Sequence, residues 1–247
     1  RRYLDRVLHG MRPYLAERLP VVVLEPSCAS VFKDELYNLM PDSQDAAALR
    51  DRTMLLSDLL AREAKLWIPP KLPGRALVQG HCHQKALFGV DSEQKVLDAI
   101  GLEHEVLEAG CCGMAGAFGF VDETHRVGVA CGERALLPRV RSAPLETIVM
   151  ANGFSCREQI AQRTERGALH LAEVMKLALD RGPGEALEPR AEARIVTRRR
   201  AAMRASMLRA AIRIVAVIGT AIAGATLVRR RRRTSVLGRA LRRALAS

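Results

Sequence analysis

Short apolar segments alternate with amphipathic segments over the first 180 residues. The apolar segments are rich in Val, Leu and Ile and predict buried strands at 21–24, 75–79, 105–107 and 147–150. Between them, apolar residues recur at spacings of three and four, which predicts helices over 46–66, 92–100, 123–140 and 168–179. Ser92 and Gly101 are the expected caps of the second of these helices. The alternation predicts an α/β fold with a parallel sheet and helices on both of its faces.

A cysteine follows every predicted strand. The segments are Glu25-Pro26-Ser27-Cys28, His81-Cys82-His83, Gly110-Cys111-Cys112-Gly113 and Gly153-Phe154-Ser155-Cys156. The carboxyl ends of parallel strands share one edge of a sheet, where ligands bind, and helix N-termini at that edge favour thiolates. The fold class we expect is therefore α/β, built of parallel-sheet βα units with cysteines at the carboxyl ends of the strands. The residues expected to converge there are Cys28, Cys82, Cys111, Cys112 and Cys156.

Several kinds of chemistry could use a group of five cysteines. Structural zinc is usually held by close CxxC or CxxH pairs, and the chain contains no CxxC. Stable disulfides belong to oxidising compartments, and no signal peptide opens this chain. A catalytic thiolate needs one activated cysteine rather than five. Iron–sulfur clusters are held by several thiolates and suit the pattern best, with zinc, a redox disulfide and inert cysteines left as alternatives.

The net charge of +12 is unevenly divided along the chain. Residues 1–183 hold 23 Lys and Arg against 24 Asp and Glu, whereas residues 184–247 hold 16 Arg and three Glu. The 49% apolar content excludes a wholly disordered chain, and six cysteines in 247 residues exclude a small disulfide scaffold. We therefore expect a domain over 1–181, a linker over 182–197 and a basic helical tail over 198–247.

The tail contains an apolar stretch at 210–228 that carries one charge, on Arg213, and is flanked by runs of arginine. A spanning helix needs about 20 apolar residues, so this stretch predicts a marginal membrane helix or a helix on an anionic membrane surface. The alternative is a basic tail that binds nucleic acid without specificity. We expect a cytoplasmic, membrane-associated protein with no specific nucleic-acid partner. Because the chain opens on Arg1, we also expect it to be part of a longer protein or a trimmed one.

Taken together, the four cysteine segments resemble the cysteine-rich CCG domain of iron–sulfur oxidoreductases. The matching stretches are 24–28, 81–87, 110–119 and 153–160, and the resemblance covers roughly residues 1–181. The sequence of these stretches is most similar to the C-terminal part of FAD-linked, iron–sulfur D-2-hydroxyacid dehydrogenases of the lactate, glycolate and 2-hydroxyglutarate types. Related domains occur in heterodisulfide reductase, in lactate-utilisation proteins and in the iron–sulfur subunits of glycolate oxidase and anaerobic glycerol-3-phosphate dehydrogenase.

The resemblance implies an electron-transfer module of a flavin-linked oxidoreductase that acts on CH–OH groups. It implies that Cys28, Cys82, Cys111, Cys112 and Cys156 hold a [4Fe–4S]-type cluster. The cluster would pass electrons from a flavin dehydrogenase domain or subunit to a quinone or other carrier. No FAD-binding stretch is visible, so FAD would belong to a missing segment or a partner. The alternatives are thiol–disulfide chemistry like that of heterodisulfide reductase, which the missing CxxC disfavours, and a non-enzymatic membrane- or nucleic-acid-binding protein.

Residues beside the cysteines are candidates for tuning the site. They are His81, His83, Gly113, Lys85 and Arg157. The histidines could be ligands or proton carriers, but such residues more often orient a loop or hydrogen-bond a sulfur. Cys131 lies inside a predicted helix and is expected to be a buried apolar residue, and Glu25 is expected to make an ion pair at the edge of the core.

Overall fold

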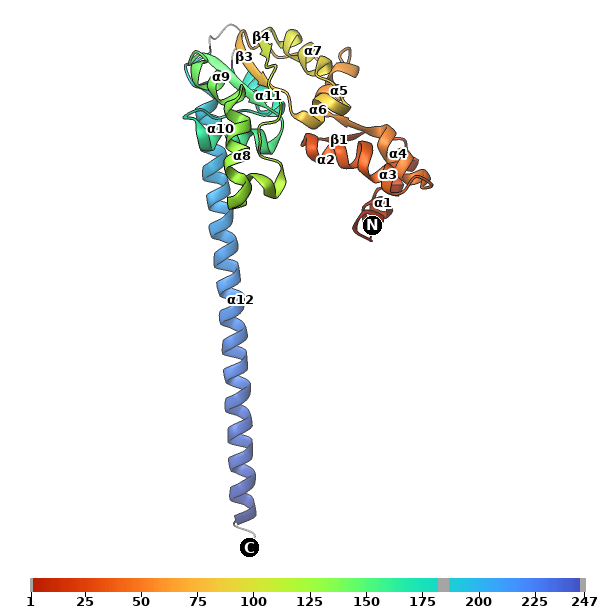
Figure 1. The fold of residues 1–247 in the computed structure, drawn as a ribbon. Coiled ribbons are helices and arrows are strands. Elements are labelled where there is room, and N and C mark those ends of the chain that lie inside the picture. The colour runs from red at the N-terminus through yellow and green to blue at the C-terminus, as the bar shows by residue number, and fades with distance from the viewer. Residues whose placement is uncertain (1, 182–186, 245–247) are drawn as a thin grey trace. The chain divides into compact units, whose positions relative to one another are not determined.

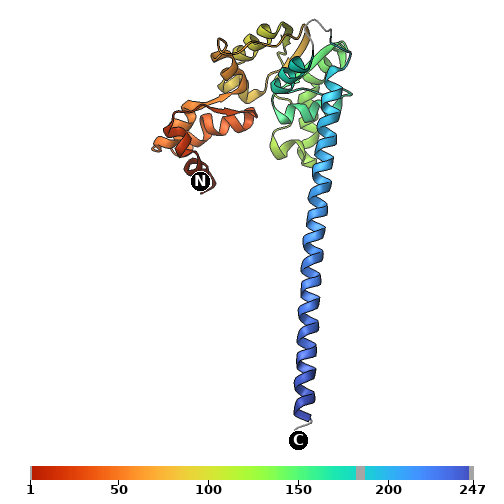
Figure 2. The same ribbon diagram turned by 180° about the vertical axis from the view of Figure 1, so that it is seen from behind.

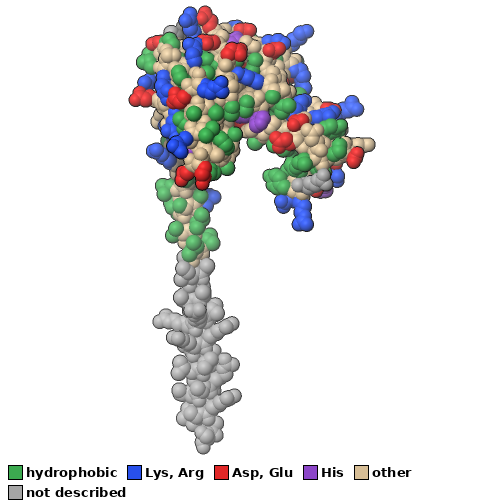
Figure 3. Space-filling model, viewed as in Figure 1, with side chains coloured by type: hydrophobic (Ala, Val, Ile, Leu, Met, Phe, Trp, Pro, Cys, Tyr) green, Lys and Arg blue, Asp and Glu red, His purple; other side chains and the backbone are tan. Residues whose placement is uncertain are grey.

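The computed structural model describes residues 2–181 and 187–244, with side chains as far as Ile218. The chain divides into two units, Arg1–Val196 and Thr197–Ser247. The first unit mixes helices with five short parallel strands, as expected for an α/β fold. On the face of this unit seen in Figure 3, acidic and basic side chains are interspersed, in keeping with its balanced charge.

The larger sheet has three parallel strands in the order β4–β3–β5. Strand β3 (Gly74–Gln79) lies between β4 (Leu102–Val106) and β5 (Thr147–Ala151). Strands β3 and β4 are labelled in Figure 1, and Figure 2 shows the same ribbon from behind. The register pairs Val78 of β3 with both Val106 and Met150. Because all three strands run the same way, the segments that follow them leave from one edge of the sheet.

Two apolar clusters cover the two faces of this sheet. On one face, Ala76 and Val78 pack with buried residues of α7 (Asp91–Ile100) and α11 (Leu171–Asp180). On the other, Leu77 and Val149 pack with buried residues of α9 (Leu136–Ser142) and α10 (Phe154–Arg163). The other helices around the sheet are α6 (Cys82–Leu87) and α8 (Asp122–Glu133). Strands β3 and β5 are buried on both faces, as expected, whereas the edge strand β4 exposes Glu103 and Glu105.

A smaller parallel sheet pairs β1 (Val21–Val23) with β2 (Thr53–Leu55). Its neighbours are α1 (Arg2–Ala16), α2 (Pro26–Ser30), a π-helical turn (Val31–Glu35), α3 (Leu36–Leu39), α4 (Gln44–Arg52) and α5 (Leu56–Arg62). A third apolar cluster joins α1, α3 and α4. The single sheet expected from the sequence is therefore wrong, because β1 pairs with a strand that the sequence analysis did not predict.

Strand β2 interrupts the helix expected over 46–66. The Thr53 hydroxyl donates to the carbonyl of Leu49, and the Asp58 carboxylate accepts the N–H of Leu55 at 2.9 Å. These bonds end α4 and begin α5, leaving three residues extended between them. Asp58, three residues after Leu55, was the sequence signal for this new helix start.

Two other helix expectations also need correction. The helix expected over 123–140 is two helices, because Pro138 in the first turn of α9 has no N–H to continue α8. The helix expected over 92–100 does end at Gly101, whose φ of +75° is the left-handed C-cap conformation. Its N-cap, however, is Val90 rather than Ser92.

Helix α12 (Ala191–Ala244) begins inside the segment expected to be a linker. Glu192 in its first turn accepts a hydrogen bond of 2.6 Å from the buried Arg166. The same guanidinium donates to the carbonyls of Ala143, Pro144 and Thr147. This ion pair fixes the start of α12 to the first unit. Residues 182–186 of the expected linker lie outside the described residues.

The helix expected to meet a membrane over 210–228 is part of α12, and its side chains after Ile218 lie outside the described residues. Across the part of the chain that was described, no helix is both long enough and apolar enough to cross a membrane.

Replacing Glu192 with Ala leaves the buried Arg166 charge without its carboxylate. We expect the free energy of unfolding of the full chain to fall by about 3 kcal/mol in urea titrations. The matched control is Glu188→Ala, which removes an exposed ion pair with Arg194 at 3.5 Å and should cost under about 0.5 kcal/mol. Equal losses from the two variants would contradict this role of Glu192.

Candidate functional site

Each of the five candidate cysteines lies in the segment that follows a strand. Cys28 lies in α2 after β1, and Cys82 is the first residue of α6 after β3. Cys111 and Cys112 lie in the loop after β4, and Cys156 lies in α10 after β5. Three of these segments leave from the same edge of the larger sheet, which accounts for their approach to one another.

A cavity of about 580 Å³ lies where these segments meet. Cys28, Cys82, Cys111 and Cys112 line it, while Cys156 is buried beside Cys112. The other lining side chains are mostly apolar, with a few polar groups among them. These residues are Met114, Ala115, Ala117, Phe120 and Phe154, with Glu25, Ser27, His81, His83 and Ser155 as the polar ones. The site thus combines thiols with an apolar wall.

The thiols form a hydrogen-bonded group around Cys112. A hydrogen bond donated by Cys156, assisted by the N–H of Met114 and the hydroxyl of Ser155, lowers the pKa of Cys112 to about 6 despite its burial. Burial raises the pKa of Cys111 to about 11. The bond to Cys112 and burial raise the pKa of Cys156 well above its usual range. The site therefore favours a thiolate at Cys112 beside protonated thiols at Cys111 and Cys156.

His81 is buried at the base of the cavity. Its Nδ1 accepts the N–H of His83, so the neutral ring carries its proton on Nε2, which faces the Ser155 hydroxyl at 3.5 Å. Burial lowers the pKa of His81. The ligand atoms of His81, Cys82 and His83 all lie within 4.8 Å of one another, so this group could also hold a metal ion.

Gly153 makes room for the His81 ring. A Cβ at this position would lie 2.1 Å from His81 Cδ2. The glycine also occupies the N-cap of α10, at the start of the segment that carries Cys156. Close packing therefore explains Gly153, and the sequence alone could not show a contact between residues so far apart.

Glu25 joins the Cys28 segment to the Cys156 segment. Its carboxylate accepts the hydroxyl of Ser27 at 2.8 Å and the N–H of Phe154 at 2.6 Å. Phe154 is the first residue of α10, so Glu25 caps this helix from a segment 129 residues away. An ion pair at the core edge was expected for Glu25 from the sequence, whereas the structure shows this bridging role.

Lys85 and Arg157 hold backbone beside the site. The Lys85 ammonium donates to the carbonyls of Leu107 and Ala109, each at 2.9 Å, in the loop that leads to Cys111. Arg157 donates to the carbonyls of Ala151 and Asn152. Both cations therefore position the segments that carry the cysteines.

Gly113 has two structural reasons to be glycine. Its φ is +86°, and a Cβ would lie 1.9 Å from the carbonyl oxygen of Gly128 in α8. Its N–H donates to Cys111 Sγ at 3.3 Å. Cys131 contributes to this packing from α8, is half-buried and does not line the cavity.

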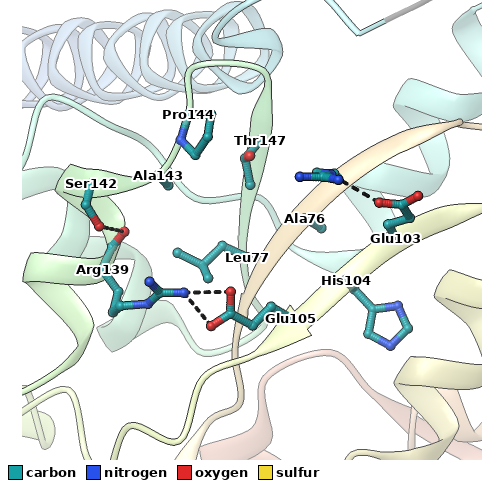
Figure 4. Close-up of a pocket in the computed structure, with 11 residues that line it drawn as sticks. Ala76, Leu77, Glu103, His104, Glu105, Arg139, Ser142, Ala143, Pro144 and Thr147 are labelled. Atoms are coloured by element: carbon teal, nitrogen blue, oxygen red, sulfur yellow. Dashed lines mark hydrogen bonds and ion pairs between the residues drawn. The ribbon is translucent and has the colours of Figure 1, made fainter.

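A second cavity, of about 290 Å³, lies towards the amino ends of the same strands (Figure 4). Its charged groups are neutralised in pairs, because Arg139 donates to both oxygens of Glu105 and Arg75 pairs with Glu103 at 3.1 Å. No cysteine is among the described residues that line it. The thiols of the candidate site therefore lie at the other end of the strands.

Comparison with known proteins finds dehydrogenases. The chain is 26% identical over 159 residues to a D-2-hydroxyglutarate dehydrogenase of Pseudomonas putida, covering 64% of this chain and 15% of that protein. It is 27% identical over 165 residues to a subunit of the anaerobic glycerol-3-phosphate dehydrogenase of Escherichia coli, covering 65% and 41%. A D-2-hydroxyglutarate dehydrogenase of Escherichia coli is 27% identical over 173 residues, covering 64% and 16%.

These relatives confirm the expected similarity to oxidoreductases of two kinds. The chain spans 15% and 16% of the length of the two D-2-hydroxyglutarate dehydrogenases and 41% of the glycerol-3-phosphate dehydrogenase polypeptide. No protein-family model matches the chain, and no solved structure matches it. Membership of the CCG family therefore stays a prediction.

Substituting Gly113 with Ala should strongly destabilise the first unit. The new Cβ would collide with the Gly128 carbonyl, and the φ of +86° disfavours alanine. We expect the free energy of unfolding to fall by about 3 kcal/mol or more in urea titrations. Gly110→Ala is the matched control, because no atom lies within 4 Å of its added Cβ. Similar stability of the two variants would show that the close approach of Gly113 and Gly128 is wrong.

The metal-free chain should show one thiolate that forms with a midpoint near pH 6, measured anaerobically by absorbance at about 240 nm. Cys112→Ser should abolish this step, and Cys131→Ser should leave it unchanged. Because the pKa of Cys112 is lower in the folded chain than in the unfolded one, this group adds stability as pH rises from about 6 towards 9 and loses it on acidification. Titration of every thiol above pH 8 would contradict the hydrogen-bonded group.

Proposed function

We propose that the chain is an iron–sulfur electron-transfer module of a flavin-linked oxidoreductase that acts on a 2-hydroxyacid or a related CH–OH group. The observation that carries the proposal is the grouping of Cys82, Cys111, Cys112 and Cys156 from three separate segments of the chain. The first three line one cavity, and Cys156 is buried beside Cys112. The similarity to two kinds of dehydrogenase supports a redox role.

The donor set fits a [4Fe–4S]-type cluster. Four thiols complete a four-cysteine ligand set, and Cys28 reaches the cavity from the smaller sheet as a fifth. The N–H groups of Gly113 and Met114 donate to Cys111 and Cys112, as expected where sulfur carries negative charge. Open volume remains beside the sulfurs. Zinc would need only four of these ligands and would make no use of the cavity.

A bound cluster would supply one-electron transfer. This chain's residues would hold the cluster through the five cysteines and surround it with the apolar wall formed by Met114, Phe120 and Phe154. His81, His83 and Ser155 would supply hydrogen bonds at its edge. The flavin would belong to another domain or polypeptide, and the electrons would leave to a quinone or other carrier.

The experiment that tests this proposal is reduction of the anaerobically reconstituted chain by photoreduced flavin, followed as loss of its visible absorbance. We expect rapid bleaching in the wild type. Cys111→Ser, Cys112→Ser and Cys156→Ser should each lose most of the iron and the bleaching, whereas Cys131→Ser should keep both. Cys28→Ser should lower the iron content less, because it leaves the mutually contacting group of Cys82, Cys111, Cys112 and Cys156 intact. Unchanged iron in the Cys111 and Cys112 variants would overturn the proposal.

Lys85→Met should make the reduction potential of the site more negative. Lys85 places a positive charge on the loop that carries Cys111, and that charge favours the reduced, more negative state. Protein-film voltammetry would measure the shift. Lys95→Met, which removes an exposed cation from α7, should leave the potential unchanged. An equal shift of the potential in both variants would contradict a specific effect of Lys85.

A further inference from the structure

The described part of α12 in the second unit exposes a run of large apolar side chains. Eight of them, between residues 203 and 218, are each 53–69% exposed. They are Met203, Met207, Leu208, Ile212, Ile214, Val215, Val217 and Ile218. Figure 3 shows hydrophobic side chains gathered along this stretch. A contiguous apolar surface of this kind marks a site that contacts another apolar phase.

From residue 205 to residue 218, the large apolar side chains and the arginines lie on different sides of the helix, whereas Arg204 lies on the apolar side. At 3.6 residues per turn, spacings of four, seven and four place Met203, Met207, Ile214 and Ile218 in one stripe. Arg209 and Arg213, four residues apart, lie on the opposite side. More arginines precede them, at 198–200 and at 204.

We propose that residues 203–218 of α12 dock on an anionic membrane surface. The stripe from Met203 to Ile218 would enter the boundary between head groups and acyl chains, and Arg209 and Arg213 would contact lipid phosphates. The proposal concerns the second unit and does not depend on the cluster in the first.

Charge and apolarity together favour this partner over two others. Nucleic acid would satisfy the arginines but would leave the apolar stripe in water. A second copy of the helix would cover the stripe but would leave Arg209 and Arg213, on the outer side of each copy, without anionic partners. An anionic bilayer satisfies both sets of side chains at once, because its phosphates attract the arginines and its acyl chains accept the stripe.

The experiment is co-sedimentation of the full chain with vesicles of phosphatidylcholine, with or without about 30% phosphatidylglycerol. We expect the chain to bind the anionic vesicles, to bind pure phosphatidylcholine at least about tenfold more weakly, and to lose affinity at high salt. Equal binding to the two vesicle types would overturn the proposal.

Two double variants test separately what the arginines and the apolar stripe of α12 contribute to vesicle binding. Arg209→Gln with Arg213→Gln should weaken partition about 30-fold, and Met207→Ser with Ile214→Ser should weaken it at least about tenfold. The matched controls change exposed residues of the first unit, Arg2→Gln with Arg126→Gln and Leu66→Ser with Ile68→Ser, and should bind as the wild type does.

Three results would overturn the docking. The first is that the arginine variants and the Met207 and Ile214 variants of α12 bind anionic vesicles as strongly as the control variants do. The second is that the wild-type chain does not bind vesicles but forms a dimer, which the Met207 and Ile214 substitutions dissociate. That result would identify a second copy as the partner. The third is that the wild-type chain does not bind vesicles but binds nucleic acid, and that the Met207 and Ile214 variants still bind it. That result would identify nucleic acid as the partner. Iron content is measured on each variant, so a failure of docking is distinguished from a failure of the cluster proposal.

Discussion

The grouping of thiols around Cys112 is the constraint on which the rest of this account depends. One thiolate is stabilised there by donors from Cys156, Ser155 and the backbone of Met114. The hydrogen bond to Cys112 and burial raise the pKa of Cys156, and burial raises the pKa of Cys111, so these two thiols keep their protons where Cys112 is ionised. A metal that displaces these protons would couple its binding to the packing of the loop after β4 against α10.

The sequence could predict much of the fold because buried strands have a simple signature. Strands β1, β3 and β5 lie at the predicted short apolar segments, whereas β4 (Leu102–Val106) overlaps the segment predicted at 105–107 in only two residues, because its two glutamates and its histidine conceal it. Gly101 ends α7 through the conformation that glycine favours. The division into two sheets was beyond prediction. It depends on the pairing of Val21 with Thr53, which is set by tertiary contacts, and β2 was hidden inside an apolar pattern of helical spacing.

In the candidate site, too, the features set by neighbouring residues could be predicted, whereas those set by contacts between distant residues could not. The cysteines stand out because each follows a segment with the signature of a buried strand. The contacts that shape their surroundings could not be inferred, because Glu25 bonds to Phe154 and Gly153 packs on His81 across long stretches of chain. Pro138 shows the reverse case, since the sequence displays the break between α8 and α9 that the periodicity concealed.

The central claim is that these cysteines hold an iron–sulfur cluster. Its most direct test is the amount of iron and acid-labile sulfide per full chain purified without oxygen, together with the EPR spectrum before and after reduction. The account predicts about four irons and four sulfides per chain and a signal that changes on reduction. Zinc in their place, or freely titrating thiols with no metal, would contradict it.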